Sequence, residues 1–371
     1  MARTQHSIRM VLTGGGTGGH LFPAMATAQK LCEEYPESEV LFIGTVRKMD
    51  RRSLAGHGYT VKAVHCYGLK GKTVLQTVKA LFFLPVSFLE ALYHLICFRP
   101  QIVVGVGGYV TAPVLVAAKF LSLPTLIHEQ NSIPGLANRK LGRLVDRICL
   151  SIPGSESFFP EEKTLLTGNP VRAGILALVS RMGKRAEKGD KTVLILGGSQ
   201  GARTVNHLVV KAFTTHKGMR DGSIRVIHQT GTTDEQWVAA QYKKAGVQAE
   251  VSGFFRDMDR VYGEADLLVS RAGATTLAEL AVLGKPAILI PYPHAADDHQ
   301  MKNGEYYSQG GGAVVYGQEE LSAEKLGAAI RVILTDPGRL EQMGRAMAEM
   351  GIPDAPDRII GCCLRLLKKK K

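Results

Sequence analysis

Residues 266–303, DLLVSRAGATTLAELAVLGKPAILIPYPHAADDHQMKN, decide the fold of this 371-residue chain. The stretch begins with a short apolar run, 266–270, which predicts a buried strand. A helix is expected from Thr275 to Gly284, since glycine commonly ends a helix, and the apolar run 287–290 predicts a second strand. Together they form a β-α-β unit, typical of a parallel sheet whose ligands bind at the carboxyl ends of the strands.

The residues that follow the first strand of this unit suit a nucleotide sugar. Gly273 lacks a Cβ and lets a ligand approach the backbone, and the helix N-terminus behind it favours a phosphate. Glu279, about one turn into the helix, would accept both hydroxyls of a ribose. Gln300 and Asn303 share one face of the next helix and would bond sugar hydroxyls. The alternative is an ordinary β-α-β unit in which these three side chains are solvated.

Composition describes a globular protein of two domains. The chain exceeds the ~250–300 residues at which a single core stops growing, and 45% of its residues are hydrophobic against 21% charged. A net charge of +13 suits an anionic partner, which would be nucleic acid, an anionic membrane surface or a phosphorylated substrate. The six cysteines show no CxxC or zinc-type spacing, which predicts free thiols in a reducing cytosol. The first apolar run, 8–12, ends in glycines and predicts no signal peptide.

A glycine-rich stretch follows the first predicted strand, 9–13. It reads GGGTGGH at 14–20 and contains G-x-G-x-x-G, the fingerprint of dinucleotide binding. That fingerprint expects a carboxylate at the end of the next strand, yet the strand predicted at 40–44 is followed by no acidic residue before Asp50. We therefore expect no NAD and no other cofactor, and we assign the loop to the close approach of a diphosphate. Pro23 is placed in the first turn of the following helix.

Residues 47–98 differ in character from the strands and glycine loops around them. A basic group comes first and comprises Arg47, Lys48, Arg51, Arg52, Lys62, Lys70, Lys72 and Lys79. The apolar segment 80–98 follows and approaches membrane-spanning length, but Pro85, Glu90 and His94 argue against a transmembrane helix. A buried helix, and a helix whose apolar face dips into an anionic membrane, remain as alternatives.

The pattern of strand, glycine loop and helix occurs twice. A second sheet is predicted to begin at 192–196 and is followed by the glycine loop 197–202, so the chain reads as two Rossmann-like α/β domains. We place the first domain at 1–168 and the second at 169–352, and expect a C-terminal helix at about 353–371 to pack back on the first. Two such domains imply a cleft that holds two substrates face to face.

Six motifs in order resemble one known family over essentially the whole chain. They are GGGTGGH at 14–20, GGY at 107–109, HEQN at 128–131, GNPVR at 168–172, GGSQGA at 197–202 and the segment 273–303. They are similar to the MurG family, the bacterial glycosyltransferases of peptidoglycan synthesis. The resemblance implies the two-domain GT-B fold and transfer of N-acetylglucosamine from UDP-GlcNAc to the C4 hydroxyl of lipid-linked N-acetylmuramoyl-pentapeptide (lipid I). The product would be lipid II, with the anomeric centre inverted.

The resemblance also implies the residues of the site. The donor site would comprise Thr17, Gly18, Gly19, Asn131, Arg172, Ser199, Phe255, Ala274, Thr275, Thr276, Leu277, Ala278, Glu279 and Gln300. The acceptor diphosphate would lie at Gly15, Gly16, Gly18, Gly108 and Tyr109. The catalytic residues would be His20, Glu129 and Asn131.

Within the implied donor site each group has a part. The backbone of Phe255 would read the edge of the uracil, and Glu279 would hold the ribose. Ser199 and the helix N-terminus behind it would hold the diphosphate, and Gln300 would face the sugar.

An inverting transfer needs a base for the acceptor hydroxyl. His20 is the candidate, because the positive end of a nearby helix dipole disfavours the imidazolium and keeps the ring neutral. The alternatives are a structural His20 bonded to a backbone carbonyl, and Glu129 as the base or as an orienting group. Arg172 and helix N-termini would stabilise the leaving UDP without a metal. Asp257 and Asp259 spell DxD, which we interpret as a capping or solvated pair.

The expected partners follow from the implied reaction. They are UDP-GlcNAc, a polyprenyl-diphosphate-linked muramoyl peptide, the anionic cytoplasmic face of the bacterial inner membrane, where the protein would be peripheral, and other cell-wall synthesis proteins. No nucleic acid is expected, since no basic stripe interleaves with aromatic residues. A UDP-GlcNAc 2-epimerase would share the fold but leave the segment 47–98 unexplained. A non-catalytic nucleotide-sugar binding protein is the other alternative, against which His20, Glu129 and Asn131 argue.

Overall fold

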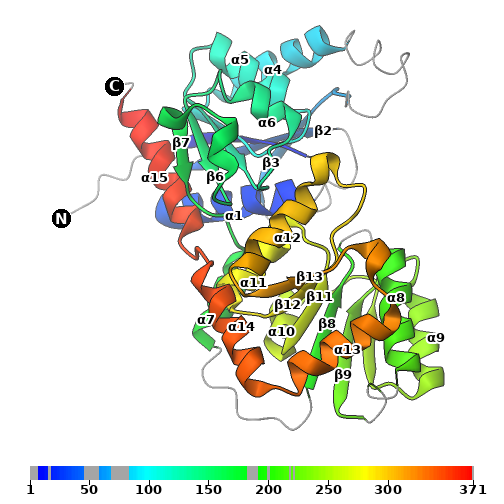
Figure 1. Ribbon diagram of the computed structural model, residues 1–371. Helices are drawn as coiled ribbons and strands as arrows, with labels where there is room; N and C mark the ends of the chain where they lie inside the picture. The colour runs from blue at the N-terminus through cyan, green and yellow to red at the C-terminus, as the bar shows by residue number, and fades with distance from the viewer. Residues whose placement is uncertain are drawn as a thin grey trace. The chain divides into compact units, whose positions relative to one another are not determined.

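The computed structural model describes residues 7–15, 18–45, 58–67, 83–181, 191–198, 201–216, 219 and 222–369. The chain divides into two compact units (Figure 1), which we call the first and second units. The first unit comprises Met1–Arg172 and Pro353–Lys371, and the second comprises Ala173–Ile352. The first crossing between them falls after Arg172, whereas the sequence placed it at 168.

The first unit is built on a parallel sheet whose strand order, in its described part, is β3-β2-β1-β4-β5-β6-β7. The strands are β1 (Arg9–Thr13), β2 (Glu39–Thr45), β3 (Thr60–Val64), β4 (Ile102–Gly105), β5 (Thr125–Glu129), β6 (Arg147–Leu150) and β7 (Thr164–Leu166). The helices are α1 (Gly18–Glu34), α4 (Leu84–Phe98), α5 (Thr111–Phe120), α6 (Leu136–Leu141) and α15 (Ala355–Lys368), with short 3₁₀ turns η1 (Ser155–Phe158) and η2 (Glu161–Lys163). β3 was not predicted, because this edge strand is half exposed and carries Lys62 within the basic group.

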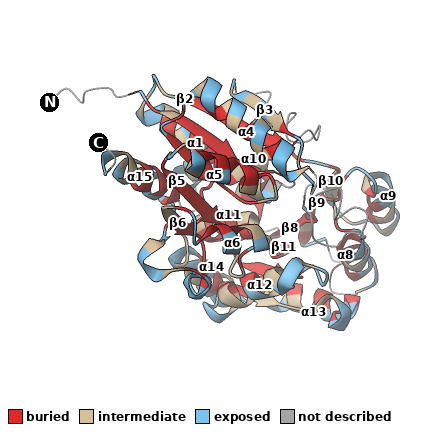
Figure 2. Ribbon diagram, turned by 90° about the horizontal axis from the view of Figure 1, so that it is seen from above, coloured by how far each residue is buried: buried red, intermediate tan, exposed pale blue. Residues whose placement is uncertain are grey.

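Alternate residues of each strand point to opposite faces of this sheet. In β1, Met10 and Leu12 belong to the core under α1 and α15, whereas Val11 belongs to the core under α4 and α5. Figure 2 shows the result, with buried residues along the strands and on one side of each covering helix. α15 contributes Ile359 and Ile360 to the first core, so the last helix of the chain completes the first unit.

The second unit is built on a parallel sheet with the described order β10-β9-β8-β11-β12-β13. The strands are β8 (Lys191–Leu196), β9 (Ile224–Gln229), β10 (Ala249–Ser252), β11 (Leu267–Ser270), β12 (Ala287–Leu289) and β13 (Ala313–Val315). The helices are α7 (Ala173–Arg181), α8 (Arg203–Thr215), α9 (Glu235–Ala245), α10 (Met258–Glu264), α11 (Ala274–Leu283), α12 (His299–Gln309), α13 (Ala323–Leu334) and α14 (Pro337–Glu349), with 3₁₀ turns η4 (Ala296–Asp298) and η5 (Gln318–Glu320). The β-α-β unit predicted at 266–290 is confirmed as β11, α11 and β12.

Two helix boundaries were predicted from a single residue each: the end of α11 from Gly284 and the start of α1 from Pro23. α11 ends where predicted, with Gly284 as its left-handed cap at φ 61°. The predicted start of α1 was wrong, because the helix begins at Gly18 and Pro23 lies inside it rather than in its first turn. The earlier start places His20 in the first turn of α1, at the end of the glycine loop.

Each sheet has one point at which the strand order reverses. In the first unit it lies between β1 and β4, and in the second between β8 and β11. Loops that follow two such strands diverge and leave a crevice at the carboxyl ends, where α/β proteins bind ligands. The glycine motifs at 14–20 and 107–109 follow β1 and β4, and those at 197–202 and 271–273 follow β8 and β11. The fold therefore places these four motifs at the two reversal points, whereas the motifs at 128–131 and 168–172 lie at the carboxyl ends of β5 and β7.

The apolar segment 80–98 forms α4 over its described part. Its buried side is formed by Ser87, Ala91 and Leu95, and several large apolar side chains on its other sides are exposed. A fully buried helix is therefore excluded for this segment. In the described part of the chain no helix is both long and apolar enough to cross a membrane.

Candidate active site

Two glycine loops are pressed together at the reversal point of the first sheet. A Cβ added to Gly108 would lie 2.6 Å from the carbonyl oxygen of Gly15, and one added to Gly14 would lie 2.3 Å from a methyl group of Val106. Such approaches are closer than real Cβ contacts allow, so these positions require glycine. The loops proposed for the acceptor diphosphate thus hold each other in place through their backbones.

His20 lies over the second of these loops. A Cβ on Gly107, whose φ is +104°, would lie 2.9 Å from both Cε1 and Nδ1 of the His20 ring. The ring is half-buried, and its Nδ1 lies 3.0 Å from Oε1 of Gln130. Its partner is thus a side-chain amide, rather than the backbone carbonyl considered from the sequence.

Gln130 and His128 continue this contact into the interior. Nε2 of Gln130 donates to the carbonyl oxygen of Val106 at 2.9 Å and lies 3.1 Å from Nδ1 of His128. Nε2 of His128 lies 3.1 Å from the carbonyl oxygen of Gly168. Burial lowers the pKa of His128 to about 4, so its ring is neutral at pH 7.

Of the four residues of the HEQN motif, only Glu129 and Asn131 were predicted to have roles in the site. The missed signal is strand alternation, because His128 in β5 points to the face opposite to Glu129, and Gln130, the first residue after β5, continues the alternation and contacts His128. The two faces carry separate networks. One reaches His20, and the other surrounds the carboxylate of Glu129.

Glu129 is a buried hydrogen-bond acceptor. Its Oε1 accepts the backbone and side-chain N–H groups of Asn131 at 3.0 and 3.2 Å. Its Oε2 accepts from Asn138 Nδ2 at 2.8 Å and from the Gly135 N–H at 3.2 Å. With four donors around a side chain that is 2% exposed, the carboxylate is suited to orienting Asn131 rather than to receiving a proton from a substrate.

The GNPVR motif, residues 168–172, lies at the end of the first of the two chain segments that form the first unit. The guanidinium of Arg172 lies over the ring of Phe22, 5.0 Å from its centroid, on helix α1. Asn169 is 5% exposed, and neither polar atom of its side chain has a partner in the described part of the chain. A buried amide without partners is costly, so a water or a ligand group is expected there.

The second unit presents two helix N-termini at its reversal point. The N-cap residues of α8 and α11 are Ala202 and Gly273, and neither of these two residues has a side chain that can cap the first turn. A Cβ added at Gly273 would meet no described atom within 4 Å, so the space before α11 is open. First-turn N–H groups that face open space are suited to binding a phosphate.

Residues at the start of α11 differ in what they offer. Thr275 and Thr276 are half-buried, whereas the side chains of Ala274, Leu277 and Ala278 are buried, so these three would act through backbone groups. The expectation of a solvated Glu279 is excluded, and so is an exposed Asn303. The first is 4% exposed and accepts a 2.7 Å hydrogen bond from Tyr262, and the second is fully buried and donates to the carbonyl of Ala272.

Two further residues predicted for the donor site already have partners. Gln300 accepts the N–H of Tyr292 through Oε1 at 2.9 Å. The N–H of Phe255 donates to Oε1 of Gln229 at 3.1 Å, so the carbonyl is the backbone group that Phe255 has left for a base edge. Among the other predicted residues, Gly16, Thr17, Ser199 and the basic group except Lys62 lie outside the described residues.

Asp257, the first carboxylate of the DxD sequence, belongs to an ionic network. Asp257 pairs with Arg260 at 2.5 Å, and Arg260 also pairs with Glu250 and Glu264. The arginine lowers the pKa of the Asp257 carboxyl. Across the described ranges, no three His, Cys, Asp or Glu side chains are grouped in a way that could hold a metal ion.

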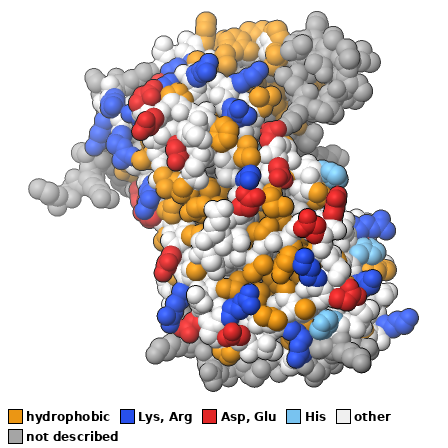
Figure 3. Space-filling model, in the orientation of Figure 1, with side chains coloured by type: hydrophobic (Ala, Val, Ile, Leu, Met, Phe, Trp, Pro, Cys, Tyr) orange, Lys and Arg blue, Asp and Glu red, His pale blue; other side chains and the backbone are white. Residues whose placement is uncertain are grey.

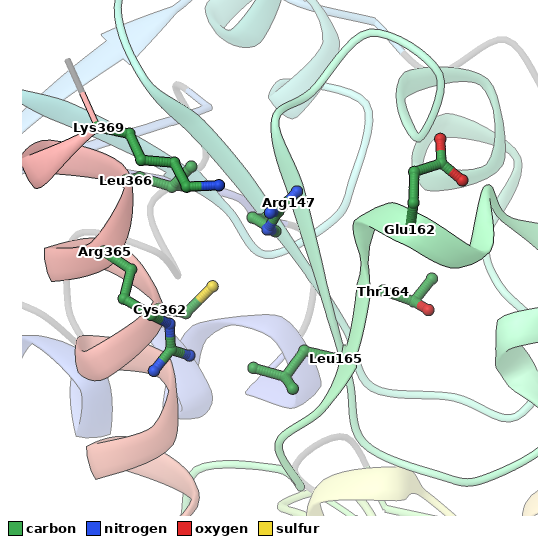
Figure 4. Close-up of a pocket in the computed structure, with 8 residues that line it drawn as sticks. All are labelled: Arg147, Glu162, Thr164, Leu165, Cys362, Arg365, Leu366 and Lys369. Carbon is green, nitrogen blue, oxygen red and sulfur yellow. The ribbon is translucent and has the colours of Figure 1, made fainter.

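A pocket on the first unit lies between α15 and the β6–β7 edge (Figure 4). Arg147, Arg365 and Lys369 line it together with Cys362. The S–H of Cys149 and then the charge of Arg365 lower the pKa of Cys362 to about 7. None of the predicted site residues lines this pocket, so it is separate from the motifs.

Comparison with known proteins relates the whole chain to one family. The models of the glycosyltransferase family 28 N-terminal and C-terminal domains match residues 10–150 and 192–359. A UDP-N-acetylglucosamine–N-acetylmuramyl-(pentapeptide) pyrophosphoryl-undecaprenol N-acetylglucosamine transferase from Desulfotalea psychrophila is 54% identical over 361 residues, which cover 97% of either chain.

Solved structures agree with this relation. The crystal structure of Acinetobacter baumannii MurG matches with a TM-score of 0.77 at 27% identity, over 96% of this chain and 99% of that one. A UDP-GlcNAc 2-epimerase from Neisseria meningitidis, bound to UDP-GlcNAc, matches with a TM-score of 0.66 at 15% identity, over 96% of this chain and 100% of that one. The second likeness is one of fold alone. The chain therefore belongs to the MurG family of N-acetylglucosamine transferases, within glycosyltransferase family 28.

Proposed function

We propose that this protein transfers N-acetylglucosamine from UDP-GlcNAc to the C4 hydroxyl of N-acetylmuramoyl-pentapeptide carried on diphosphoryl-undecaprenol, with inversion of the anomeric centre. The observation that supports the reaction most strongly is 54% identity over 97% of the chain to a transferase named for these substrates. The glycine loops and helix N-termini at both reversal points are the groups that two diphosphate substrates would need.

His20 is proposed as the base. Its Nδ1 is engaged with Gln130 while the ring is half-buried, so Nε2 is the nitrogen available to a substrate hydroxyl. In a single displacement the acceptor oxygen bonds the anomeric carbon as the bond to UDP breaks, and Nε2 takes the hydroxyl proton. Glu129 would hold Asn131, which would contact the donor sugar or the acceptor.

The leaving UDP would be stabilised by fixed dipoles and one cation. The N-termini of α8 and α11, whose N-cap residues are Ala202 and Gly273, present N–H groups whose positive partial charge is in place before the reaction begins. Arg172 would add a full charge. These groups meet the developing negative charge on the diphosphate without a metal.

Recognition of the nucleoside would use groups that the second unit already holds rigidly. A carboxylate has about four acceptor sites, so Glu279 can bond a ribose while it accepts from Tyr262. The carbonyl of Phe255 would accept the N3–H of uracil, since the N–H of Phe255 donates to Gln229. Gln300 would reach the sugar through its amide nitrogen, because its oxygen is bonded to Tyr292.

The lipid-linked acceptor implies a membrane surface, and we propose that α4 and α5 contact it. Val86, Leu89, Tyr93 and Ile96 follow helical spacing on α4, and Val116 and Phe120 lie on α5; all six are exposed, Phe120 by 71%. We call these residues the apolar face. Figure 3 shows hydrophobic side chains gathered on the surface over these helices, with basic side chains nearby. Such a face suits peripheral binding to the anionic cytoplasmic leaflet.

The reaction is tested by label transfer from radiolabelled UDP-GlcNAc to a short-chain lipid I analogue. Wild-type protein should form the labelled disaccharide product, and His20→Ala should reduce kcat by about 10²- to 10⁴-fold with donor binding retained. An unchanged rate in His20→Ala would remove the base role from His20. Formation of UDP-ManNAc from the donor alone, without transfer, would favour the epimerase instead.

Membrane contact is tested separately by co-sedimentation with phosphatidylglycerol vesicles. Leu89→Glu combined with Tyr93→Glu should weaken binding, because both side chains are exposed on the apolar face. Val332→Glu, which changes an exposed apolar residue of α13, is the matched control. Equal binding of all three proteins would exclude the apolar face as the contact.

A further inference from the structure

We infer that Gln130 and His128 are positioning residues that fix the tautomer of His20. They hold the imidazole with its proton on Nδ1, so that the lone pair of Nε2 faces outward to accept the substrate proton. This inference rests on the proposed function for its catalytic meaning, but the tautomer is a property of the protein alone. It follows from a chain of four hydrogen-bonding groups.

The chain begins at a group that can only accept. The carbonyl oxygen of Gly168 lies 3.1 Å from Nε2 of His128, so Nε2 carries a proton and donates it. The hydroxyl oxygen of Ser151, 2.9 Å away, can accept the same N–H. Because the buried ring of His128 is neutral, its Nδ1 bears a lone pair and accepts.

Because Nδ1 of His128 is an acceptor, it determines which end of the Gln130 amide faces it. Its Nε2 donates to the Val106 carbonyl at 2.9 Å and lies 3.1 Å from the accepting Nδ1 of His128. Reversing the amide would place an oxygen against two acceptors inside the protein, which is costly at a side chain only 2% exposed. Two independent acceptors therefore fix the orientation of the amide.

The tautomer of His20 follows. With Nε2 of Gln130 turned inward, Oε1 faces Nδ1 of His20 at 3.0 Å. An amide oxygen cannot donate, so Nδ1 must carry the proton and the neutral ring has its lone pair on Nε2. An imidazole without this contact would divide between two tautomers, of which one cannot accept a proton at Nε2.

The position of the ring is held as well as its proton. The His20 ring lies against the backbone of Gly107, whose missing Cβ leaves the space that the ring fills. Val106, which holds the Gln130 amide, is the neighbour of Gly107 in the chain. The loop after β4 therefore fixes both the place of the imidazole and, through Gln130, its tautomer.

Selective ¹⁵N-histidine labelling of the full chain tests the tautomer directly. Ring nitrogens with a proton and with a lone pair have well-separated ¹⁵N shifts, and His20→Ala identifies the His20 signals by their loss. At pH values where the ring is neutral, the wild type should show a protonated Nδ1 and an unprotonated Nε2. A protonated Nε2 in the wild type would overturn the inference even if the protein transfers N-acetylglucosamine normally.

Kinetics of Gln130→Leu provide the second test. We expect the His20 signals to move toward a mixture of tautomers, kcat to fall about 10- to 100-fold, and KM for UDP-GlcNAc to stay within twofold. Gln29→Leu, on the exposed side of α1 where the amide donates to Glu33, is the control and should match the wild type. An unchanged tautomer or an unchanged kcat in Gln130→Leu would overturn the inference. If instead His20→Ala keeps its rate, the base assignment fails while the tautomer measurement stands by itself.

Discussion

Each unit holds a buried histidine in a hydrogen-bonded network near its glycine loop, but the two networks end differently. In the first unit the chain from His128 passes through Gln130 to the half-buried His20. In the second unit His228 lies 3.1 Å from Oδ1 of Asn206 and 3.0 Å from the hydroxyl of Tyr242. All three of these side chains are buried.

The difference is between a polar network that only stabilises the core and a polar network that ends at a group able to meet a substrate. Asn206 also donates to the Thr230 carbonyl and to Asp234, so each described group of the second network bonds another buried group. A closed network of this kind rigidifies the core beneath the glycine loop. The first network has one end at the surface of the reversal point, where a nitrogen can meet substrate. The same chemistry of amide and imidazole thus supports a loop in one unit and would aim a base in the other.

The largest expected effect comes from opening the closed network. Asn206→Leu would leave Asp234, the Thr230 carbonyl and His228 without their partner, and should lower the free energy of unfolding by about 3–5 kcal/mol. Urea denaturation followed by circular dichroism measures it. Lys211→Leu, exposed on the same helix, should change stability by no more than about 0.5 kcal/mol. A similar decrease in the free energy of unfolding in both variants would mean that the buried hydrogen bonds of Asn206 do not stabilise the protein.

Acid should weaken both networks, because each contains a histidine that is neutral when folded. The folded-state pKa values are about 4 for His128 and about 3 for His228, below the ordinary 6.5. As pH falls through 6.5 the unfolded chain takes up protons first, so stability is complete above that pH and is lost progressively toward pH 4 and 3. At pH 5 each histidine should account for about 2 kcal/mol.

Urea unfolding at pH 7.5, 6 and 5 checks the acid effect. The experiment is repeated at high salt, which screens surface charges but not buried groups. A profile that is flat between pH 6.5 and 5 would contradict the burial of both rings. A loss that disappears at high salt would assign it to the surface instead.

A smaller effect, on kcat, is expected from displacing His20, the residue at which the first network ends. Gly107→Ala would push the His20 ring, 2.9 Å from the new Cβ, and we expect kcat to fall about tenfold, equivalent to about 1.4 kcal/mol. Gly154→Ala is the matched control: its φ is +90° and no described atom lies within 4 Å of the new Cβ, so it adds backbone strain alone. Steady-state kinetics of the two variants separate the displaced ring from the strained backbone. Equal rates would place the reacting group elsewhere.

The smallest effect should come from metal removal. Helix N-termini and Arg172 are proposed to stabilise the negative charge on the diphosphate, and Asp257 is already paired with Arg260. EDTA should therefore leave the rate of label transfer within error of the untreated enzyme. Loss of activity that Mg²⁺ or Mn²⁺ restores would show that the second unit also needs a cation.

Regular elements were predictable because their signals are local. The strands predicted at 9–13, 40–44, 192–196, 266–270 and 287–290 end within about one residue of β1, β2, β8, β11 and β12, and Gly284 marked the end of α11. β13 was missed because three residues carry too little pattern, and β3 because it is half exposed. Pro23 misled the start of α1, since the helix continues through it.

Side-chain partners were less predictable than strands. The sequence left open whether Glu279 and Asn303 are solvated, and the structure buries both. Glu279 accepts from Tyr262 and Asn303 donates to the Ala272 carbonyl, and each partner is distant in sequence. Gln130 gained its importance from contacts with Val106, which directly follows β4, and with His20, in the first turn of α1. Such partners depend on the order of strands in the sheet, which no local pattern specifies.

The placement of α15 has a consequence for how the protein is made. Residues 173–352 leave the ribosome before the helix that completes the core of the first unit. The second unit therefore has all of its residues available to fold while the nascent first unit still exposes the apolar surface that Ile359 and Ile360 will cover. The first unit, although most of it is synthesised first, can complete its core only after the whole of the second unit has been made.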